Sequence, residues 1–357
     1  MSSIKVIDLF CGIGGLSHGF VREGFEVAAG FDIDETCRFP FETNNNALFV
    51  NKDIREVKGS ELSAFFGKAD VRILVGCAPC QPFSTYAFKS PDKQEDAQKA
   101  KWSLLGEFAR LIEEIKPEIV SMENVPGLAK FDKSYIFQDF LKVLDKNDYF
   151  IDFKEIYCPD YGIPQQRKRL VLLASRLSPI KIMDKTHSPK TYKTVKDAIG
   201  DLEPIESGGI SEKDPIHRAS KLSDKNIQRI RQSKQGGTWR DWSEDLVLDC
   251  HRKTSGKSYG SVYGRMDWDK PSPTMTTFCT GIGNGRFGHP EQDRAISLRE
   301  AALLQTFPKT YKFVPDGQTP NTTRLSTHIG NAVPVELGQV VAKSIKFHLA
   351  QWHKTYS

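Results

Sequence analysis

Stretches of apolar residues with two different periods alternate along the first half of the chain. Continuous apolar, β-branched runs predict buried strands, and apolar residues three and four positions apart predict amphipathic helices between them. The expected strands are 4–10, 26–34, 71–76, 118–124 and 169–175, and the expected helices are 16–23, 103–117 and 137–149. Alternating strands and helices are typical of an α/β protein with a parallel, doubly wound sheet, in which ligands bind at the carboxyl ends of the strands.

The pattern changes after residue 183, where long apolar runs become rare and Lys, Asp, Ser, Gly and Pro dominate. Helical periodicity returns at 297–307, and a strong amphipathic helix is expected at 333–352. The sequence therefore predicts a larger domain and a smaller, loop-rich domain, namely residues 1–183 plus 323–357 and residues 184–322.

Composition and charge narrow the class of protein. The chain has 357 residues, 39% of them hydrophobic and 27% charged, which is ordinary for a globular protein with a large core. No apolar run approaches the ~20 residues that span a bilayer, and the first residues lack the features of a signal peptide, so we expect a cytoplasmic protein. The net charge of +5 is compatible with a polyanionic partner. The seven cysteines are expected to be reduced thiols.

A glycine-rich turn, in the sequence DLFCGIGGLSHGF, follows the first expected strand. Gly12, Gly14 and Gly15 allow the backbone to turn tightly and to approach a ligand. Their spacing does not match the dinucleotide fingerprint, which argues against NAD. Asp32, at the end of the second strand, suits a ribose diol, and Asp53 could accept a hydrogen bond from an exocyclic amine. These features predict an adenosine-type cofactor, with a purely structural turn as the alternative.

Cys77 and Cys80 are three positions apart and follow the expected strand 71–76. A zinc site would require a second pair of cysteine or histidine ligands, which the sequence lacks, so no metal is expected. A redox couple fits the position between a strand and a helix but leaves the polar residues near the other strands unexplained. Two half-buried thiols that only pack are the third interpretation.

Other polar groups adjoin two further strands. Glu123 and Asn124 end the strand 118–124, and Arg167 and Arg169 lead into the strand 169–175. If these ends meet at one edge of the sheet, a thiol, a carboxyl group and guanidinium groups lie together beside the cofactor loop. A carboxyl group that follows an apolar run is expected to be buried, and a buried carboxyl group either has a partner or stays protonated. A protonated Glu123 would be suited to donate a proton.

Six motifs, taken in order, resemble those of the DNA (cytosine-5)-methyltransferase family of bacterial restriction-modification systems. They are DLFCGIGG, GCAPCQPFS, MENVPGL, QQRKR, SLREAALLQTFP and IGNAVP. The resemblance extends from residue 8 to about residue 345. It implies a Rossmann-like AdoMet-dependent methyltransferase sheet (AdoMet is S-adenosyl-L-methionine) with a second, smaller, loop-rich target-recognition domain. It also implies that the last helix packs on the first strand and helix, so that the N- and C-terminal segments form one domain.

The resemblance implies methyl transfer from AdoMet to carbon 5 of a cytosine flipped out of duplex DNA. It makes Cys80 the nucleophile that adds to carbon 6, and it leaves Cys77 as a packing residue. Glu123 would bind ring nitrogen 3 and the exocyclic amine, Arg169 would hold the carbonyl oxygen, and Arg167 would order the pocket and favour the thiolate. The substrate pocket would also include Pro79, Gln81, Ser84 and Asn124.

The resemblance also assigns the cofactor site. Phe10 would lie against the adenine ring, Asp32 would bind the ribose, and Asn331 would lie near the methionine end. The expected AdoMet-binding residues are Phe10, Gly12, Gly14, Gly15, Leu16, Asp32, Ile33, Asp53, Ile54, Leu104 and Asn331. Because some family members have an aromatic residue where Ile33 stands, stacking on the adenine would be one-sided.

Target recognition is expected within residues 186–290. The basic stretch 217–240, with Trp239 and Trp242, and the loop 251–265 would contact phosphates and base edges, with a solvated basic surface as the alternative. The expected partners are double-stranded DNA and a functionally paired restriction endonuclease, without a membrane, and the expected state is a monomer.

Three other functions stay open. The same chemistry could act on tRNA, as in the tRNA-methylating branch of the family. The chain could be an inactive DNA-binding member, although it has Cys80, Glu123 and both arginines. It could also be a Rossmann oxidoreductase with a Cys-x-x-Cys couple, which the glycine spacing disfavours.

Overall fold

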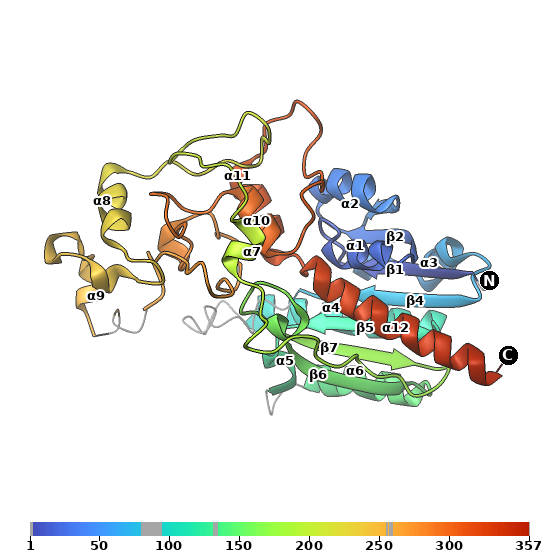
Figure 1. The fold of residues 1–357 in the computed structure, drawn as a ribbon. Helices are drawn as coiled ribbons and strands as arrows, with labels where there is room; N and C mark the ends of the chain where they lie inside the picture. Colours follow the sequence, from blue (N-terminus) through green and yellow to red (C-terminus); the bar gives the residue numbers. More distant parts are fainter. Residues whose placement is uncertain (1–2, 80–94, 131–134, 255, 257–259, 357) are drawn as a thin grey trace. The chain divides into compact units, whose positions relative to one another are not determined.

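The computed structural model describes residues 3–79, 95–130, 135–254, 256 and 260–356. The chain divides into two compact units (Figure 1). Unit 1 consists of Met1–Tyr157, Lys168–Lys185 and Val333–Ser357, and unit 2 consists of Cys158–Arg167 and Thr186–Ala332.

The boundaries of the units differ from the sequence-based division at residues 158–167 and 323–332, which belong to unit 2. The side chain of Gln165 explains the first difference, because it donates a hydrogen bond to the carbonyl oxygen of Leu304 at 3.1 Å. The segment 158–167 is thus bonded to residues far along the chain rather than to the strands on either side of it.

Unit 1 is built on a seven-stranded sheet with the order β3-β2-β1-β4-β5-β7-β6. Strands β1 to β5 pair in parallel, whereas β7 pairs antiparallel with both β5 and β6. The strands are β1 (Ile4–Leu9), β2 (Glu26–Asp32), β3 (Leu48–Asn51), β4 (Val71–Gly76), β5 (Ile119–Asn124), β6 (Phe150–Tyr157) and β7 (Lys168–Ser175).

The expectation that all strands are parallel is therefore wrong for β7. Only residues 158–167 separate β6 from β7, and a parallel crossover needs a dozen or more residues. Strand β6 was not expected at all, because seven of its eight side chains are exposed or partly exposed and its apolar pattern is broken. The sheet is a mixed α/β sheet, parallel through its centre with an antiparallel edge.

Helices cover both faces of the sheet in unit 1. On one side, α3, α4 and α6 enclose a core of buried aliphatic and phenylalanine side chains. The last helix, α12, packs on α1, as expected from the sequence. The helices are α1 (Gly15–Arg22), α2 (Arg38–Asn45), α3 (Gly59–Phe66), α4 (Glu95–Ile115), α5 (Gly127–Lys130), α6 (Tyr135–Lys146) and α12 (Val335–Tyr356), with 3-10 turns η1 (Glu35–Cys37) and η2 (Ile54–Glu56). Among the described residues, no helix is long and apolar enough to span a membrane.

Unit 2 consists of short helices joined by long irregular segments, as expected for a loop-rich region. Two small apolar clusters lie within it, one around Trp239 and Trp242 and the other around Ile230 and Ile282. Its helical elements are η4 (Cys158–Tyr161), α7 (Val195–Ile199), α8 (Asp224–Gln232), η5 (Trp239–Asp241), η6 (Glu244–Leu246), α9 (Asp249–Arg252), η8 (Ile282–Asn284), α10 (Leu298–Leu304) and α11 (Thr322–Asn331).

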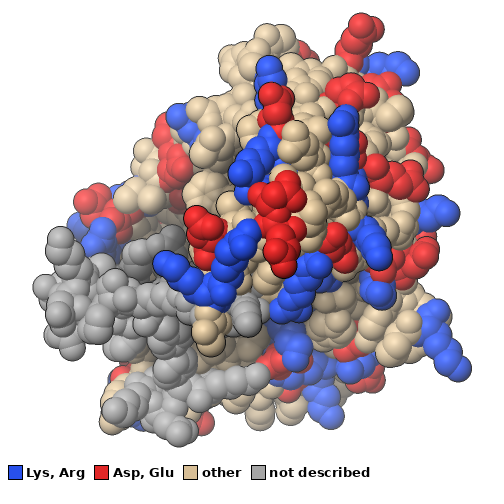
Figure 2. Space-filling model, turned by 90° about the vertical axis from the view of Figure 1, so that its left-hand side faces the viewer, with Lys and Arg blue, Asp and Glu red and all other residues tan. Residues whose placement is uncertain are grey.

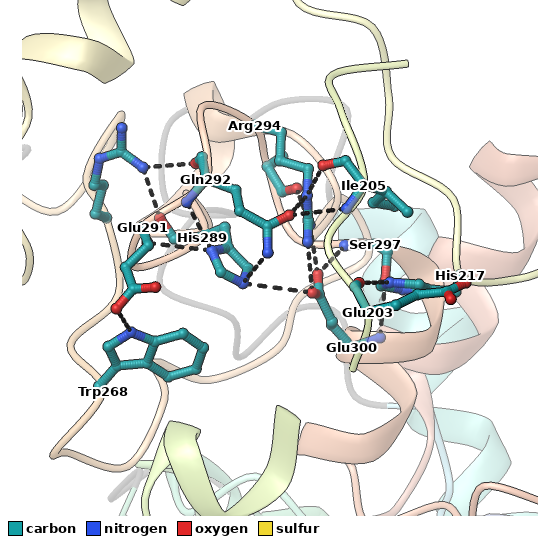
Figure 3. A network of polar contacts seen from close by, with 12 residues as sticks. Glu203, Ile205, His217, Trp268, His289, Glu291, Gln292, Arg294, Ser297 and Glu300 are labelled. Carbon is teal, nitrogen blue, oxygen red and sulfur yellow. Dashed lines mark hydrogen bonds and ion pairs between the residues drawn. The ribbon is translucent and has the colours of Figure 1, made fainter. Parts of the chain in front are cut away.

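A buried polar network holds the irregular segments of unit 2 together at the start of α10 (Figure 3). The guanidinium group of Arg294 donates to both oxygens of Glu300, at 2.7 and 2.8 Å. Burial opposes ionisation of Glu300, but the contact with Arg294 holds the pKa of this carboxyl group below its ordinary value. His217 bonds to the Ser297 hydroxyl at 2.9 Å. Burial lowers the pKa of the neighbouring His289 to about 4. The network adds buried polar contacts to segments that have little regular secondary structure.

Candidate functional site

Three strands of unit 1 bring Cys77, Glu123 and Arg169 together at the carboxyl edge of the parallel sheet. Gly76 at the end of β4 is paired with Met122 of β5, so the next residues, Cys77 and Glu123, are neighbours. Strand β7 runs antiparallel to β5, and its early residues pair with the end of β5. The residues that lead into β7 therefore lie at the same edge as the residues that end β4 and β5. In a parallel β7, Arg169 would lie at the opposite edge.

The carboxyl group of Glu123 is the centre of this arrangement. Glu123 is only 3% exposed. The guanidinium Nε of Arg169 lies 2.8 Å from Oε1, and the thiol of Cys77 donates to Oε2 at 2.7 Å. Among the described residues, Oε1 has no hydrogen bond of good direction despite its ion pair. Most buried carboxyl oxygens in proteins accept a hydrogen bond, so Oε1 of Glu123 is an exception among the described residues.

Asn124 secures the backbone around this carboxyl group. Its side-chain amide donates to the carbonyl oxygen of Ala78 at 3.1 Å and accepts from the backbone N–H of Val125 at 2.8 Å. These bonds tie the segment after β4 to the end of β5. Pro79, the last described residue before the gap, is exposed. Asn124 therefore has a structural role beside the expected pocket.

Three expected pocket residues, Cys80, Gln81 and Ser84, lie outside the described residues. The expectation that Cys77 only packs is wrong, because its thiol is bonded to Glu123. The signal that could have found this contact is the parallel pairing of β4 and β5, which places the residue after each strand beside its neighbour. The sequence alone did not establish that register.

The glycine-rich turn after β1 is tied to the end of β2. The backbone N–H of Gly12 donates to Oδ2 of Asp32 at 2.8 Å, and the backbone N–H of Asp34 donates to Oδ1 at 2.9 Å. Phe10 has a φ of 62° and Gly14 has a φ of 85°. A left-handed backbone is strained for phenylalanine, and such strain is found most often at functional sites. Asp32 is thereby held with its carboxylate partly exposed.

Asp8, which was not among the expected site residues, lies directly behind this turn. It is 1% exposed, and the hydroxyl of Ser17 donates to its Oδ2 at 2.6 Å. Burial raises the pKa of Asp8 to about 7, and the nearby charge of Asp32 acts in the same direction. An acidic residue inside an apolar strand was the available signal for this group.

The other expected cofactor residues in unit 1 differ in how far their side chains are exposed. Ile33 is 68% exposed, an unusual exposure for an apolar side chain that follows a buried strand. Leu104 is partly buried and packs against the core. The side chain of Ile54 belongs to that core and is 4% exposed, so only its backbone can contact a ligand. The carboxylate of Asp53 caps η2 and is paired with Arg55. The role of Asp53 as an acceptor for an exocyclic amine stays a prediction, and its carboxylate already has these partners.

These residues fit an adenosine-type cofactor at the ends of β1 and β2. The Asp32 carboxylate accepts two backbone N–H groups and still has lone pairs for two hydroxyl hydrogens. A β-carbon on Gly12 would meet no atom within 4 Å, so the backbone there is open to a ligand. Exposed Ile33 offers an apolar surface to a flat ring. Gly15 and Leu16, at the start of α1, are buried and position the turn.

In unit 2, the motif that contains Gln165 and Arg167 meets the segment that contains Asn331. Arg167 is 3% exposed and donates to the carbonyl oxygens of Met275 at 3.3 Å, Gly330 at 3.4 Å and Ala332 at 3.4 Å. The carbonyl groups of Gly330 and Ala332 flank Asn331, which is exposed at the end of α11. The arginine thus orders the backbone around Asn331.

A glutamine pair reinforces the same segment. The amide of Gln305 donates to the carbonyl oxygens of Ile329 at 2.6 Å and Ala332 at 3.1 Å, while Gln165 donates to Oε1 of Gln305 at 2.8 Å. Gln305 belongs to the expected motif SLREAALLQTFP and Gln165 to QQRKR. Three motifs that are distant in the sequence therefore meet through buried amide groups, a role that the sequence reading did not assign to either glutamine.

The expected recognition region has fewer available cations and aromatic residues than its sequence suggested. Trp239 and Trp242 are 9% and 7% exposed and pack in a core cluster with Leu246, so the expectation that they reach DNA is wrong. Arg229 is buried and donates to the Leu246 carbonyl oxygen at 3.0 Å. Arg265 is also buried. A region with little regular structure needs these large side chains for its own core.

Exposed basic side chains remain in this region. Lys221, Lys225 and Lys234 are exposed, and Arg231 is paired with Asp293 at 2.9 Å. Figure 2, which shows the face that carries α8 and α9 in Figure 1, has lysine and arginine side chains interspersed with acidic ones over the part that is described. The exposed cations in the described part of this region thus include arginine side chains, such as Arg240, as well as lysines, and acidic side chains are interspersed with them.

Comparisons with known proteins identify the family of the chain. Residues 4–347 match the family model described as C-5 cytosine-specific DNA methylase. A type II methylase of Herpetosiphon aurantiacus, M.HgiDII, is 56% identical over 98% of this chain and 97% of its own length. A type II methyltransferase of a Psychrobacter species, M.PspPI, is 31% identical over 96% of this chain and 79% of its own length.

Solved structures give the same fold. The crystal structure of a candidate DNA modification methyltransferase encoded within an E. coli prophage has a TM-score of 0.73 at 24% identity, and the match covers 98% of this chain and 100% of the other. A DNMT2 variant of Spodoptera frugiperda has a TM-score of 0.64 at 16% identity, over 96% of this chain and 100% of the other.

Proposed function

Because the chain belongs to the C-5 cytosine-specific DNA methylase family, whose members methylate cytosine in DNA with AdoMet as the methyl donor, we propose a specific mechanism for it. The enzyme acts on a cytosine flipped out of a defined duplex sequence, and it does so through a covalent bond between Cys80 and carbon 6 of the base. The product besides methylated DNA is S-adenosyl-L-homocysteine.

The observation that carries this proposal is the buried carboxyl group of Glu123 beside Arg169. A carboxyl oxygen and a guanidinium group 2.8 Å apart present an acid and a cation to one small, planar ligand. Cytosine has a matching edge, with ring nitrogen 3 and the exocyclic amine facing a carboxyl group and the carbonyl oxygen facing a cation. The burial of Glu123 excludes water and strengthens both contacts.

The role of each group follows from the weak nucleophilicity of carbon 5. A thiolate of Cys80 that forms a bond to carbon 6 shifts electron density to carbon 5, while Glu123 gives a proton to nitrogen 3. AdoMet supplies the methyl group to carbon 5. Loss of the carbon 5 proton to a base, with cleavage of the carbon–sulfur bond, then releases the Cys80 thiolate, and return of the nitrogen 3 proton to Glu123 restores the neutral aromatic ring.

The residues of the substrate pocket and of the cofactor site are proposed from the family to which the chain belongs. Asp32 would bind the ribose hydroxyls, Ile33 and Phe10 would lie against adenine, and Arg167 would hold the backbone around Asn331 for the methionine end. The remaining proposed contacts to the cofactor are Gly12, Gly14, Gly15, Leu16, Asp53, Ile54 and Leu104, and those to the base are Pro79, Gln81, Ser84 and Asn124.

We assign target recognition to residues 186–290 of unit 2. The relative M.HgiDII is named a type II methylase, which supports a functional pairing with a restriction endonuclease of the same specificity. The exposed lysines of this region would contact phosphates, and the segments around them would read base edges. The enzyme is proposed to act as a monomer.

Bisulfite sequencing of DNA from a methylation-deficient bacterial host that expresses the chain tests this proposal. We expect 5-methylcytosine within one short sequence, and none in cells that express the Cys80→Ala variant. Binding of AdoMet to purified Cys80→Ala should match that of the wild type, which controls for misfolding.

Genomic DNA without methylation, in cells that contain soluble and AdoMet-binding protein, would contradict the proposal. Transfer of labelled methyl groups to total RNA would then identify RNA as the substrate. Methylation by Cys80→Ala at a rate near that of the wild type would refute the covalent step.

A further inference from the structure

Cys77 contacts the proposed acid although the proposed chemistry assigns it no role. Its backbone follows β4 beside the end of β5, and its thiol donates to Oε2 of Glu123 at 2.7 Å. The thiol is half-buried and Glu123 is almost fully buried. A cysteine that only filled space would be expected among apolar groups rather than on a buried carboxylate.

The two oxygens of Glu123 are held in different ways. Oε2 accepts the hydrogen bond from Cys77, whereas Oε1 lies beside Arg169 without a hydrogen bond of good direction among the described residues. A thiol carries one hydrogen, so this bond keeps Oε2 as an acceptor. Because Oε1 has no hydrogen bond of good direction among the described residues, a ligand can bond to it without displacing a donor, although it lies beside Arg169.

The orientation of a carboxyl group is not fixed by its own side chain. The last torsion of glutamate is broad and roughly two-fold, so either oxygen can face a ligand. A donor on one oxygen removes this freedom before the substrate binds. Preorganisation of an acid raises the fraction of bound complexes that have a reactive geometry.

Resting on the proposed function, we infer that Cys77 is a positioning residue for Glu123. Its thiol holds Oε2, so that Oε1 faces the flipped cytosine and carries the proton that is given to nitrogen 3. Cys77 acts through Glu123 and contacts neither the base nor the cofactor. Loss of its hydrogen bond should therefore slow the chemical step and leave AdoMet binding unchanged.

Three variants separate this role from packing. Cys77→Ser retains a donor, Cys77→Val retains volume without a donor, and Cys77→Ala retains neither. Single-turnover methyl transfer to duplex DNA that contains the target sequence should be about tenfold slower for Cys77→Val and Cys77→Ala, as expected for a lost hydrogen bond to a charged group. Cys77→Ser should stay within about threefold of the wild type.

AdoMet affinity and thermal unfolding are measured on the same proteins. Calorimetry should give the wild-type dissociation constant for all three variants. The matched control is Cys279→Ala, which removes a buried thiol that contacts Ser326 in unit 2 and should retain the wild-type rate.

The opposite order, with Cys77→Val fast and Cys77→Ser slow, would show that Cys77 packs and would overturn the inference. Equal rates for all variants, or weaker AdoMet binding by Cys77→Val, would overturn it too. If Cys77→Ala does not fold, the valine and serine pair still decides. A wild-type protein that transfers no methyl group to DNA would refute the proposed function itself, and the inference with it.

Discussion

Gly19 of α1 and Gly338 of α12 lie so close together that a β-carbon on Gly19 would be 2.4 Å from the carbonyl carbon of Gly338. The two helices come from opposite ends of the chain and pack along each other. Because α1 begins at the glycine-rich turn, this contact lets the C-terminal helix support the turn that leads to the cofactor site.

Gly19→Ala should therefore destabilise the protein. The added methyl group would overlap backbone atoms, which cannot move as a flexible side chain can, and overpacking of this kind costs about 1–3 kcal/mol. Urea denaturation measures the change. The control is Gly106→Ala in α4, where a β-carbon meets nothing within 4 Å and where alanine should stabilise the helix by about 0.5–1 kcal/mol. Equal stability of both variants would refute the close packing.

Asp32→Ala should weaken AdoMet binding by at least about tenfold. The substitution removes the acceptor for the ribose hydroxyls, and it also releases the backbone N–H groups of Gly12 and Asp34. The loss of a hydrogen bond to a charged group is worth about 1.5–3 kcal/mol, which corresponds to this factor. Isothermal titration calorimetry measures the dissociation constant. Asp139→Ala, which changes an exposed carboxylate of α6, is the control. An unchanged dissociation constant for Asp32→Ala would show that Asp32 does not bind the ribose.

Asp8 should make the stability of the protein fall as the pH rises from about 4 to about 7. Its pKa is raised by burial to about 7 in the folded chain and is about 3.9 in an unfolded chain. Between these values the folded state holds a proton that the unfolded state has lost, so stability is fully present below pH 4 and is lost toward pH 7. Each pKa unit corresponds to about 1.4 kcal/mol.

Asp8→Asn removes the titrating carboxyl group, so a comparison of this variant with the wild type tests the prediction. The free energy of unfolding of the variant, relative to the wild type, should rise by a few kcal/mol between pH 4 and pH 7 and then stay constant. Denaturation curves at several pH values determine the difference. Parallel pH profiles for the two proteins would show that Asp8 is ionised throughout this range.

The exposed lysines of unit 2 should contribute to DNA affinity through phosphates. Replacement of Lys221, Lys225 or Lys234 by alanine should reduce the slope of log K against log salt concentration by up to about one each, without a change in thermal unfolding. Trp239→Ala is the contrasting variant. It removes a buried ring that stacks on His251 at 4.5 Å and should cost about 3–5 kcal/mol of stability.

Unchanged slopes of log K against log salt concentration for the three lysine variants would show that other residues contact the phosphates.

Local patterns in the sequence predicted most of unit 1. The buried strands β1, β4 and β5 are continuous apolar runs, and α4, α6 and α12 have clear helical periodicity. Strand β6 was not predicted because it lies at the edge of the sheet and only one of its eight side chains is buried, so it lacks a continuous apolar run. Trp239 and Arg229 were misread because exposure in an irregular region depends on contacts that no local pattern contains.

The residue types of the candidate site and the family resemblance were readable from the sequence alone, because motifs such as GCAPCQPFS, MENVPGL and QQRKR are local strings. The meeting of Glu123 with Arg169, and the contact of Cys77 with Glu123, depended on the tertiary structure. The direction of β7 and the register between β4 and β5 place these side chains at one edge. Hydrogen bonds between distant backbone segments set direction and register, and these bonds form only when the sheet assembles.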